Sequence, residues 1–101
     1  MPEFGTVFSV KASDRKLTST ELVRAIRFMV AAEYEAIQLY MQLAESTDNK
    51  LAIEVLTDIA DEERVHAGEF LRPLSIELAP DEVKFYAEGA EEMEEEIAKM
   101  T

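Results

Sequence analysis

The chain has 101 residues, with no cysteine, one histidine and 22 acidic against 10 basic side chains, which gives a formal net charge of −12. Its length fits one small domain. The lack of cysteine excludes disulfides, thiolate metal sites and cysteine nucleophiles, and it fits a reducing, cytoplasmic setting. The acidity argues against binding to nucleic acid or to an anionic membrane, because their phosphates would be repelled.

Apolar residues make up 48% of the chain, which is typical of a folded domain rather than of a disordered acidic tail. The apolar runs are short, as in residues 28–32, so we expect no membrane-spanning segment. The N-terminus lacks the basic region followed by an apolar stretch that is typical of a signal peptide. For residues 1–17 we expect an extended arm, which forms either a short edge strand or a docking segment for a partner.

A first helix is predicted over about residues 19–46. Thr18 and Glu21 form the Thr-x-x-Glu pattern of a capping box, and neither glycine nor proline follows before residue 46. Apolar positions then recur at alternating steps of four and three residues, the spacing of a helix that packs in a bundle. This first stripe comprises Leu22, Ile26, Met29, Glu33, Ala36, Tyr40 and Leu43. A second stripe widens the apolar face and comprises Val23, Val30, Ile37 and Met41/Ala44.

A second helix is predicted over about residues 49–72, after residues 46–49 break the pattern and supply its N-cap. Its stripe comprises Ala52, Leu56, Ile59, Glu63, His66 and Phe70. Pro73 marks its predicted end, because proline lacks a backbone donor and clashes with the preceding turn. The short connection makes the two helices an antiparallel hairpin.

A third, shorter helix is predicted over about residues 80–100, with Pro80 at a favourable first position. Residues 80–101 hold eight acidic side chains against two lysines, a net charge of −6 that is half of the total. These acids form either the solvated face of an amphipathic helix or a surface that collects cations. The predicted fold is therefore all-α: an antiparallel two-helix hairpin plus a shorter C-terminal helix, in one domain of residues 18–101.

Three polar side chains interrupt the apolar stripes of the hairpin. Glu33 lies in the middle of the first stripe, and Glu63 and His66 share one face of the second helix. Glu33 lies 14 residues before the turn at about residue 47 and Glu63 lies 16 after it, so the side chains meet at nearly the same height. A buried carboxylate without a partner costs several kcal/mol. A metal dication is the simplest partner, and carboxylates with an imidazole suit iron, manganese or zinc.

Plainer interpretations remain open for each residue taken singly. His66 also fits a core histidine with satisfied hydrogen bonds, and an isolated Glu-x-x-His often occurs by chance. The arginines and lysines of the hairpin fall on other faces, which leaves the two carboxylates without an evident cation. Tyr40 lies two turns from Glu33 on the same stripe, where its hydroxyl either bonds to the site or only fills space.

The stretches AAEYEAIQLYMQLAE and ADEERVHAGEFL resemble the rubrerythrin and ferritin-like superfamily, and more closely the encapsulated ferritins, over about residues 18–100. Ferritin-like di-iron bundles take a Glu from each of two helices and Glu-x-x-His from each of the other two. This chain carries half of that set, so two copies dimerising into a ferritin-like four-helix bundle complete it. The resemblance implies that Glu33, Glu63 and His66 are iron ligands and catalytic residues, with Tyr40 beside the centre.

By the same resemblance, the expected function is a ferroxidase that oxidises Fe(II) to Fe(III), with dioxygen or peroxide as oxidant. The expected partners are further copies of the chain, in an annular decamer, and an encapsulin shell that encloses it in the cytoplasm. Glu35 and Glu62 are secondary candidates for metal binding on the route to the centre. Ala32 departs from members that carry an acidic residue at that position, which weakens the case for a full secondary site.

Two other functions fit the same residues. A di-iron peroxide scavenger of the rubrerythrin type would need an external electron donor, because the chain has no cysteine for a rubredoxin centre. A helical dimerisation module without catalysis would hold no stoichiometric iron, and leucine in place of Glu33 or His66 would then stabilise it.

Overall fold

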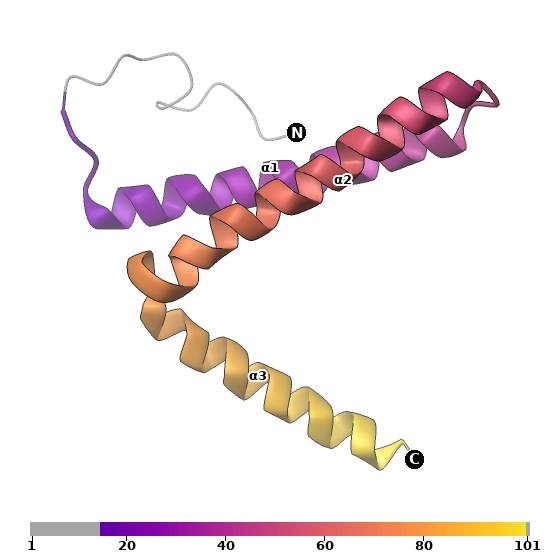
Figure 1. Ribbon diagram of the computed structural model, residues 1–101. Helices are drawn as coiled ribbons and strands as arrows, with labels where there is room; N and C mark the ends of the chain where they lie inside the picture. Colours follow the sequence, from indigo (N-terminus) through magenta and orange to yellow (C-terminus); the bar gives the residue numbers. More distant parts are fainter. Residues whose placement is uncertain (1–14, 101) are drawn as a thin grey trace.

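The computed structural model describes residues 15–100. Within them lie three α-helices, α1 (Ser19–Glu45), α2 (Lys50–Pro73) and α3 (Pro80–Lys99), and a short π-helix, η1 (Leu74–Leu78), joins the last two. No strand occurs in the part described. The helices α1 and α2 form an antiparallel hairpin, and α3 leaves its open end in another direction (Figure 1). The all-α prediction is confirmed, whereas residues 1–14 of the predicted arm lie outside the described residues.

Local sequence signals set the start of each hairpin helix. The Thr18 hydroxyl accepts a hydrogen bond from the Glu21 backbone N–H at 3.2 Å, and the Glu21 carboxylate accepts one from the Thr18 N–H at 2.9 Å. The predicted capping box is therefore present. The Arg15 guanidinium also donates to both Glu21 oxygens, at 2.8 and 2.7 Å. Asn49 caps α2 by accepting from the Ala52 N–H at 2.9 Å.

The chain stays helical beyond Pro73, which the sequence predicted only as the end of the second helix. Pro73 ends α2, but Leu74 keeps helical dihedral angles of −60° and −41°, and the chain continues as the π-helical turn η1. The Ala79 N–H closes this wider turn by donating to the Leu74 carbonyl at 2.9 Å. The Ser75 hydroxyl donates to the Arg72 carbonyl at 2.8 Å, which provides a partner near the end of α2.

The two helices of the hairpin meet along a narrow seam of small side chains. The buried residues of the described chain are Val30, Ala44, Ala60 and Ala67. Val30 and Ala44 belong to the second stripe of α1, so that stripe forms the contact within the chain. The first stripe, which carries Glu33, lies at the edge of the seam, and its Leu22, Met29 and Leu43 are exposed. Among residues 15–100 the hairpin thus leaves an apolar face without a partner, which is typical of a surface that associates.

The third helix makes little contact with the rest of the chain. Its backbone approaches only η1 within the described residues, and every side chain from Val83 to Met100 is exposed. Its apolar stripe is therefore not covered by the hairpin. None of the described helices is long and apolar enough to cross a bilayer.

Candidate metal centre

The structure brings Glu33, Glu63 and His66 together between α1 and α2. Each residue offers one ligand atom, and these atoms all lie within 4.8 Å of one another. The His66 Nδ1 atom lies 3.7 Å from Glu33 Oε2 and 3.8 Å from Glu63 Oε1. These separations exceed those of hydrogen bonds. Ligands at about 2.0–2.2 Å from one cation lie about 3–4 Å from each other, so the spacing fits a shared metal ion.

Burial explains why these side chains favour a cation. The side chain of Glu33 is 16% exposed and that of Glu63 is 20% exposed, whereas the His66 side chain is 50% exposed. The Glu33 Oε2 atom is shielded from solvent and has no hydrogen-bond partner. Leaving such an oxygen unpaired costs about 1–3 kcal/mol, and more when it is charged. A metal ion would offset this cost, so the donor set fits iron, for which carboxylates and imidazole are suitable ligands.

Residues 15–100 supply no lysine or arginine to this cluster. Arg27 forms an ion pair with Glu82 of α3, and Arg64 pairs with Asp61 on its own helix. Among the described residues, neither Glu33 nor Glu63 has a lysine or arginine partner. Within the part of the chain that the structure describes, the charge of the two carboxylates is therefore left uncompensated.

The other predicted site residues lie outside the cluster. Tyr40 is half-buried, and its hydroxyl makes no hydrogen bond to another described residue. Glu35 and Glu62 are exposed, and neither belongs to the group of three within 4.8 Å. Their roles as a neighbouring phenol and as secondary metal-binding carboxylates therefore remain predictions.

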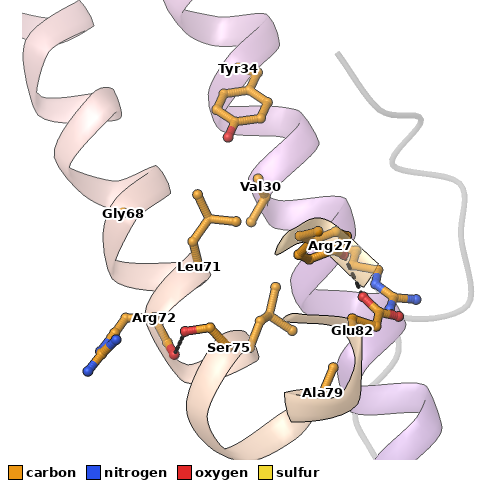
Figure 2. Close-up of a pocket in the computed structure, with 11 residues that line it drawn as sticks. Arg27, Val30, Tyr34, Gly68, Leu71, Arg72, Ser75, Ala79 and Glu82 are labelled. Atoms are coloured by element: carbon orange, nitrogen blue, oxygen red, sulfur yellow. Dashed lines mark hydrogen bonds and ion pairs between the residues drawn. The ribbon is translucent and has the colours of Figure 1, made fainter. Parts of the chain in front are cut away.

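A pocket at the open end of the hairpin was not evident from the sequence. It has a volume of about 530 Å³ and is bounded by α1, the last turns of α2, η1 and the start of α3 (Figure 2). Arg27 and Glu82 lie on one side of it and Leu71 on another. The only local signal was the spacing of Glu82 and Tyr86 by one helical turn, and nothing in the sequence places Arg27 beside them.

Two curated proteins are similar to most of this chain, although no model of a known protein family matches it. A ferritin-like–encapsulin shell fusion protein of Pyrococcus furiosus is 37% identical over 82 residues, which are 81% of this chain and 24% of that protein. The encapsulin nanocompartment cargo protein EncC of Myxococcus xanthus is 42% identical over 77 residues, 76% of this chain and 58% of that protein. The chain thus spans about a quarter of the first protein and somewhat over half of the second.

A solved structure matches nearly the whole chain. The crystal structure of the encapsulated ferritin domain from Pyrococcus furiosus has a TM-score of 0.81 and is 32% identical in sequence. The match covers 92% of this chain and 94% of that domain. It confirms the resemblance drawn from the residues around Glu33, Glu63 and His66. The chain belongs to the encapsulated ferritins.

Proposed function

We propose that the protein is a ferroxidase, which oxidises Fe(II) to Fe(III) at a centre built by Glu33, Glu63 and His66 of two chains. The observation that carries this proposal is the convergence of the three side chains within 4.8 Å, with the Glu33 Oε2 atom buried and unpartnered. Fold membership supports iron chemistry in general, and the donor set supports binding at this particular place.

A second copy completes the ligand set. One chain offers two carboxylates and one imidazole, and a two-fold axis next to the open face of the hairpin repeats them. Four carboxylates and two neutral imidazoles carry a charge of −4, which balances the +4 of two Fe(II) ions. The exposed Leu22, Met29 and Leu43 flank this face and supply apolar surface for the contact. Metal binding and dimer formation should therefore stabilise each other.

Each residue of the site has a separate task. Glu33 and Glu63 bind the substrate Fe(II), and their burial makes the empty pair of carboxylates unfavourable. His66 places its Nδ1 atom near both carboxylates, and its side chain is half exposed. When bound, two ferrous ions supply two electrons to dioxygen or peroxide and become ferric. Tyr40 is proposed to tune the site through a hydrogen bond that forms only in the assembled protein.

The acidic surface is proposed to guide Fe(II) toward the centre. Glu35, Glu62 and Glu69 are exposed along the hairpin, and the acids of α3 other than Glu82 are exposed to solvent as well. Summed negative charge raises the local concentration of cations and their rate of arrival, and added salt weakens both effects.

The setting of the reaction is proposed from the named relatives. One is described as a fusion with an encapsulin shell and the other as an encapsulin nanocompartment cargo protein. We infer that this chain also acts inside an encapsulin compartment in the cytoplasm, as an annular decamer that is built from dimers with shared iron centres. Iron oxidised there would be stored or detoxified within the shell.

Ferroxidase activity is tested by adding Fe(II) in air to the metal-free protein and following ferric absorbance. Glu63→Ala and His66→Ala should each oxidise iron at no more than the rate of buffer, and Glu54→Ala, an exposed acid on the same helix, should match the wild type. Oxidation by the first two variants at the wild-type rate would overturn the proposed site. Repeating the assay with peroxide in place of air identifies the oxidant.

Encapsulation is tested separately by co-expression with an encapsulin shell protein. The chain should elute with shells on size exclusion and should be protected from added protease. Recovery of the chain only outside intact shells would contradict this part of the proposal, and it would leave the ferroxidase assay unaffected.

A further inference from the structure

One carboxylate joins α3 to the hairpin. Glu82, in the first turn of α3, forms an ion pair through Oε1 with Arg27 of α1. Its other oxygen, Oε2, accepts a hydrogen bond from the Tyr86 hydroxyl at 2.6 Å. Both oxygens of Glu82 are therefore engaged, one across to α1 and one along α3. We refer to Arg27, Glu82 and Tyr86 as the α3 latch.

No other polar contact between described residues links α3 to the hairpin. Apart from the latch, the ion pairs and side-chain hydrogen bonds that α3 makes with described residues stay within the helix, as in Lys99 with Glu96 at 3.1 Å. The backbone of α3 approaches only η1. The latch is thus the one side-chain polar link between the hairpin and α3 in residues 15–100.

Apolar packing does not fix the direction of α3 either. Beneath the latch lies the pocket of about 530 Å³, with Val30, Leu71 and Leu74 in its lining (Figure 2). In Figure 2 Arg27 and Glu82 lie side by side across the pocket from Leu71. A space of this size means that α3 is not wedged against the hairpin by side chains that interdigitate.

The joint itself is short. The five residues of η1 connect the two long helices, and the Ala79 N–H donates to the Leu74 carbonyl at its end. The 20 residues of α3 extend for about 30 Å at 1.5 Å per residue. A change of about 20° at the joint would therefore displace the far end of α3 by about 10 Å.

We propose that the α3 latch sets the direction in which α3 projects from the hairpin. Arg27 and Glu82 act as positioning residues, and Tyr86 holds the Glu82 carboxylate in the orientation that reaches Arg27. The direction of α3 decides where its exposed Met93 and Ile97 are presented to other subunits. Closed assemblies require a fixed rotation from one contact to the next, so a fixed direction favours one assembly size.

The latch is tested by measuring the distance between two spin labels on the metal-free, full-length protein. The chain has no cysteine, so Asp58→Cys on α2 and Glu91→Cys on α3 give two specific and exposed labelling sites. Dilution with excess unlabelled chain leaves only distances within one chain. Because no iron is present, the outcome does not depend on the proposed ferroxidase.

In this double-labelled background, Glu82→Gln and Arg27→Gln should each broaden the distance distribution at least twofold. The matched control is Glu88→Gln, which removes the same charge from α3 at a residue without a hydrogen bond or ion pair to other described residues, and it should leave the distribution unchanged. Exchange of the two charges, Arg27→Glu with Glu82→Arg, should restore a narrow distribution. Equal helix content by circular dichroism confirms that each variant is folded.

An unchanged distribution in both Glu82→Gln and Arg27→Gln would overturn the proposal. Equal broadening in Glu88→Gln would also overturn it, because the effect would then come from charge alone. Tyr86→Phe removes one hydrogen bond and leaves the ion pair, so it should broaden the distribution less than Glu82→Gln does.

Discussion

Replacement of Glu33 by leucine should stabilise the metal-free protein and abolish its response to iron. Glu33 is the most buried member of the proposed metal centre, with 16% of its side chain exposed. Its Oε2 atom has neither solvent nor a hydrogen-bond partner, and the Glu63 carboxylate belongs to the same cluster. Without metal, these features oppose folding. In the proposed metal centre, the same features are the source of the affinity for iron.

The size of the effect follows from the unpaired oxygen. Burial of an unsatisfied polar group costs about 1–3 kcal/mol, and an apolar replacement of similar shape removes that cost. Glu33→Leu should therefore raise the free energy of unfolding of the metal-free protein by about 1–3 kcal/mol. For a domain of this length, each kcal/mol shifts Tm by about 4–8 °C. Fe(II) at 100 times its Kd should add about 2.7 kcal/mol to the wild type and nothing to the variant.

The assay is urea denaturation at one protein concentration, with a chelator or with anaerobic Fe(II). The fixed concentration matters because the stability of a dimer depends on it. The exposed Glu54 provides the control, since Glu54→Leu should change stability by less than about 0.5 kcal/mol and keep the full response to iron. A Glu33→Leu protein that is less stable than the wild type without metal and is still stabilised by Fe(II) would refute the reasoning.

Three further predictions address the proposed ligand, the start of α1 and the seam of the hairpin. His66→Ala should change the metal-free free energy of unfolding by less than about 0.5 kcal/mol, because the ring is half exposed, yet it should remove the rise in urea midpoint caused by Fe(II). The hydrogen bonds from Arg15 hold the pKa of Glu21 at about 2 against an ordinary value of 4.5, so this carboxylate stabilises the fold above pH 4.5 and ceases to do so as the pH falls toward 2. The difference in urea midpoint between wild type and Glu21→Gln should therefore be largest near neutral pH and should shrink to zero as the pH falls from 4.5 toward 2. A difference that stays constant with pH would contradict this role of the Glu21 carboxylate. Ala60→Leu should cost about 1–3 kcal/mol in urea denaturation because Ala60 is fully buried, whereas the exposed Ala87→Leu should cost less than about 0.5 kcal/mol.

The helices were predictable because their signals are local. The capping box of Thr18 and Glu21 and the Asn49 cap each act within one turn, and the structure has α1 over Ser19–Glu45 and α2 over Lys50–Pro73. The approach of Glu33 to Glu63 and His66 was predictable for a related reason. In an antiparallel hairpin, the number of residues on either side of the turn fixes which side chains meet.

The choice of the inner stripe was not predictable from periodicity. Both stripes of α1 repeat with the helical period, so spacing alone cannot tell a contact within the chain from a contact between chains. The structure uses the stripe of Val30 and Ala44 for the seam and leaves Met29 and Leu43 open. The small size of the buried alanines on both helices was the available clue, because small side chains let two helix backbones approach closely.

The course of the chain after Pro73 was the least predictable feature. Proline was expected to end the helix, and it does, but the wider turn of η1 has no residue signature that distinguishes it from a loop. The direction of α3 depends on Arg27 and Glu82, which are far apart in the sequence and meet only once the chain has folded. Such a pair carries no periodic or local signal.

The central claim is that one chain carries half of a two-iron centre and a second chain completes it. Native mass spectrometry of the protein with and without anaerobic Fe(II) tests this most directly, since it reports subunits and metal ions in one measurement. We predict that Fe(II) shifts the protein to dimers or multiples of dimers that hold two iron ions per pair of chains, and that Glu63→Ala prevents this shift. Iron bound to single chains, or assembly that is the same with and without iron in both proteins, would contradict the account.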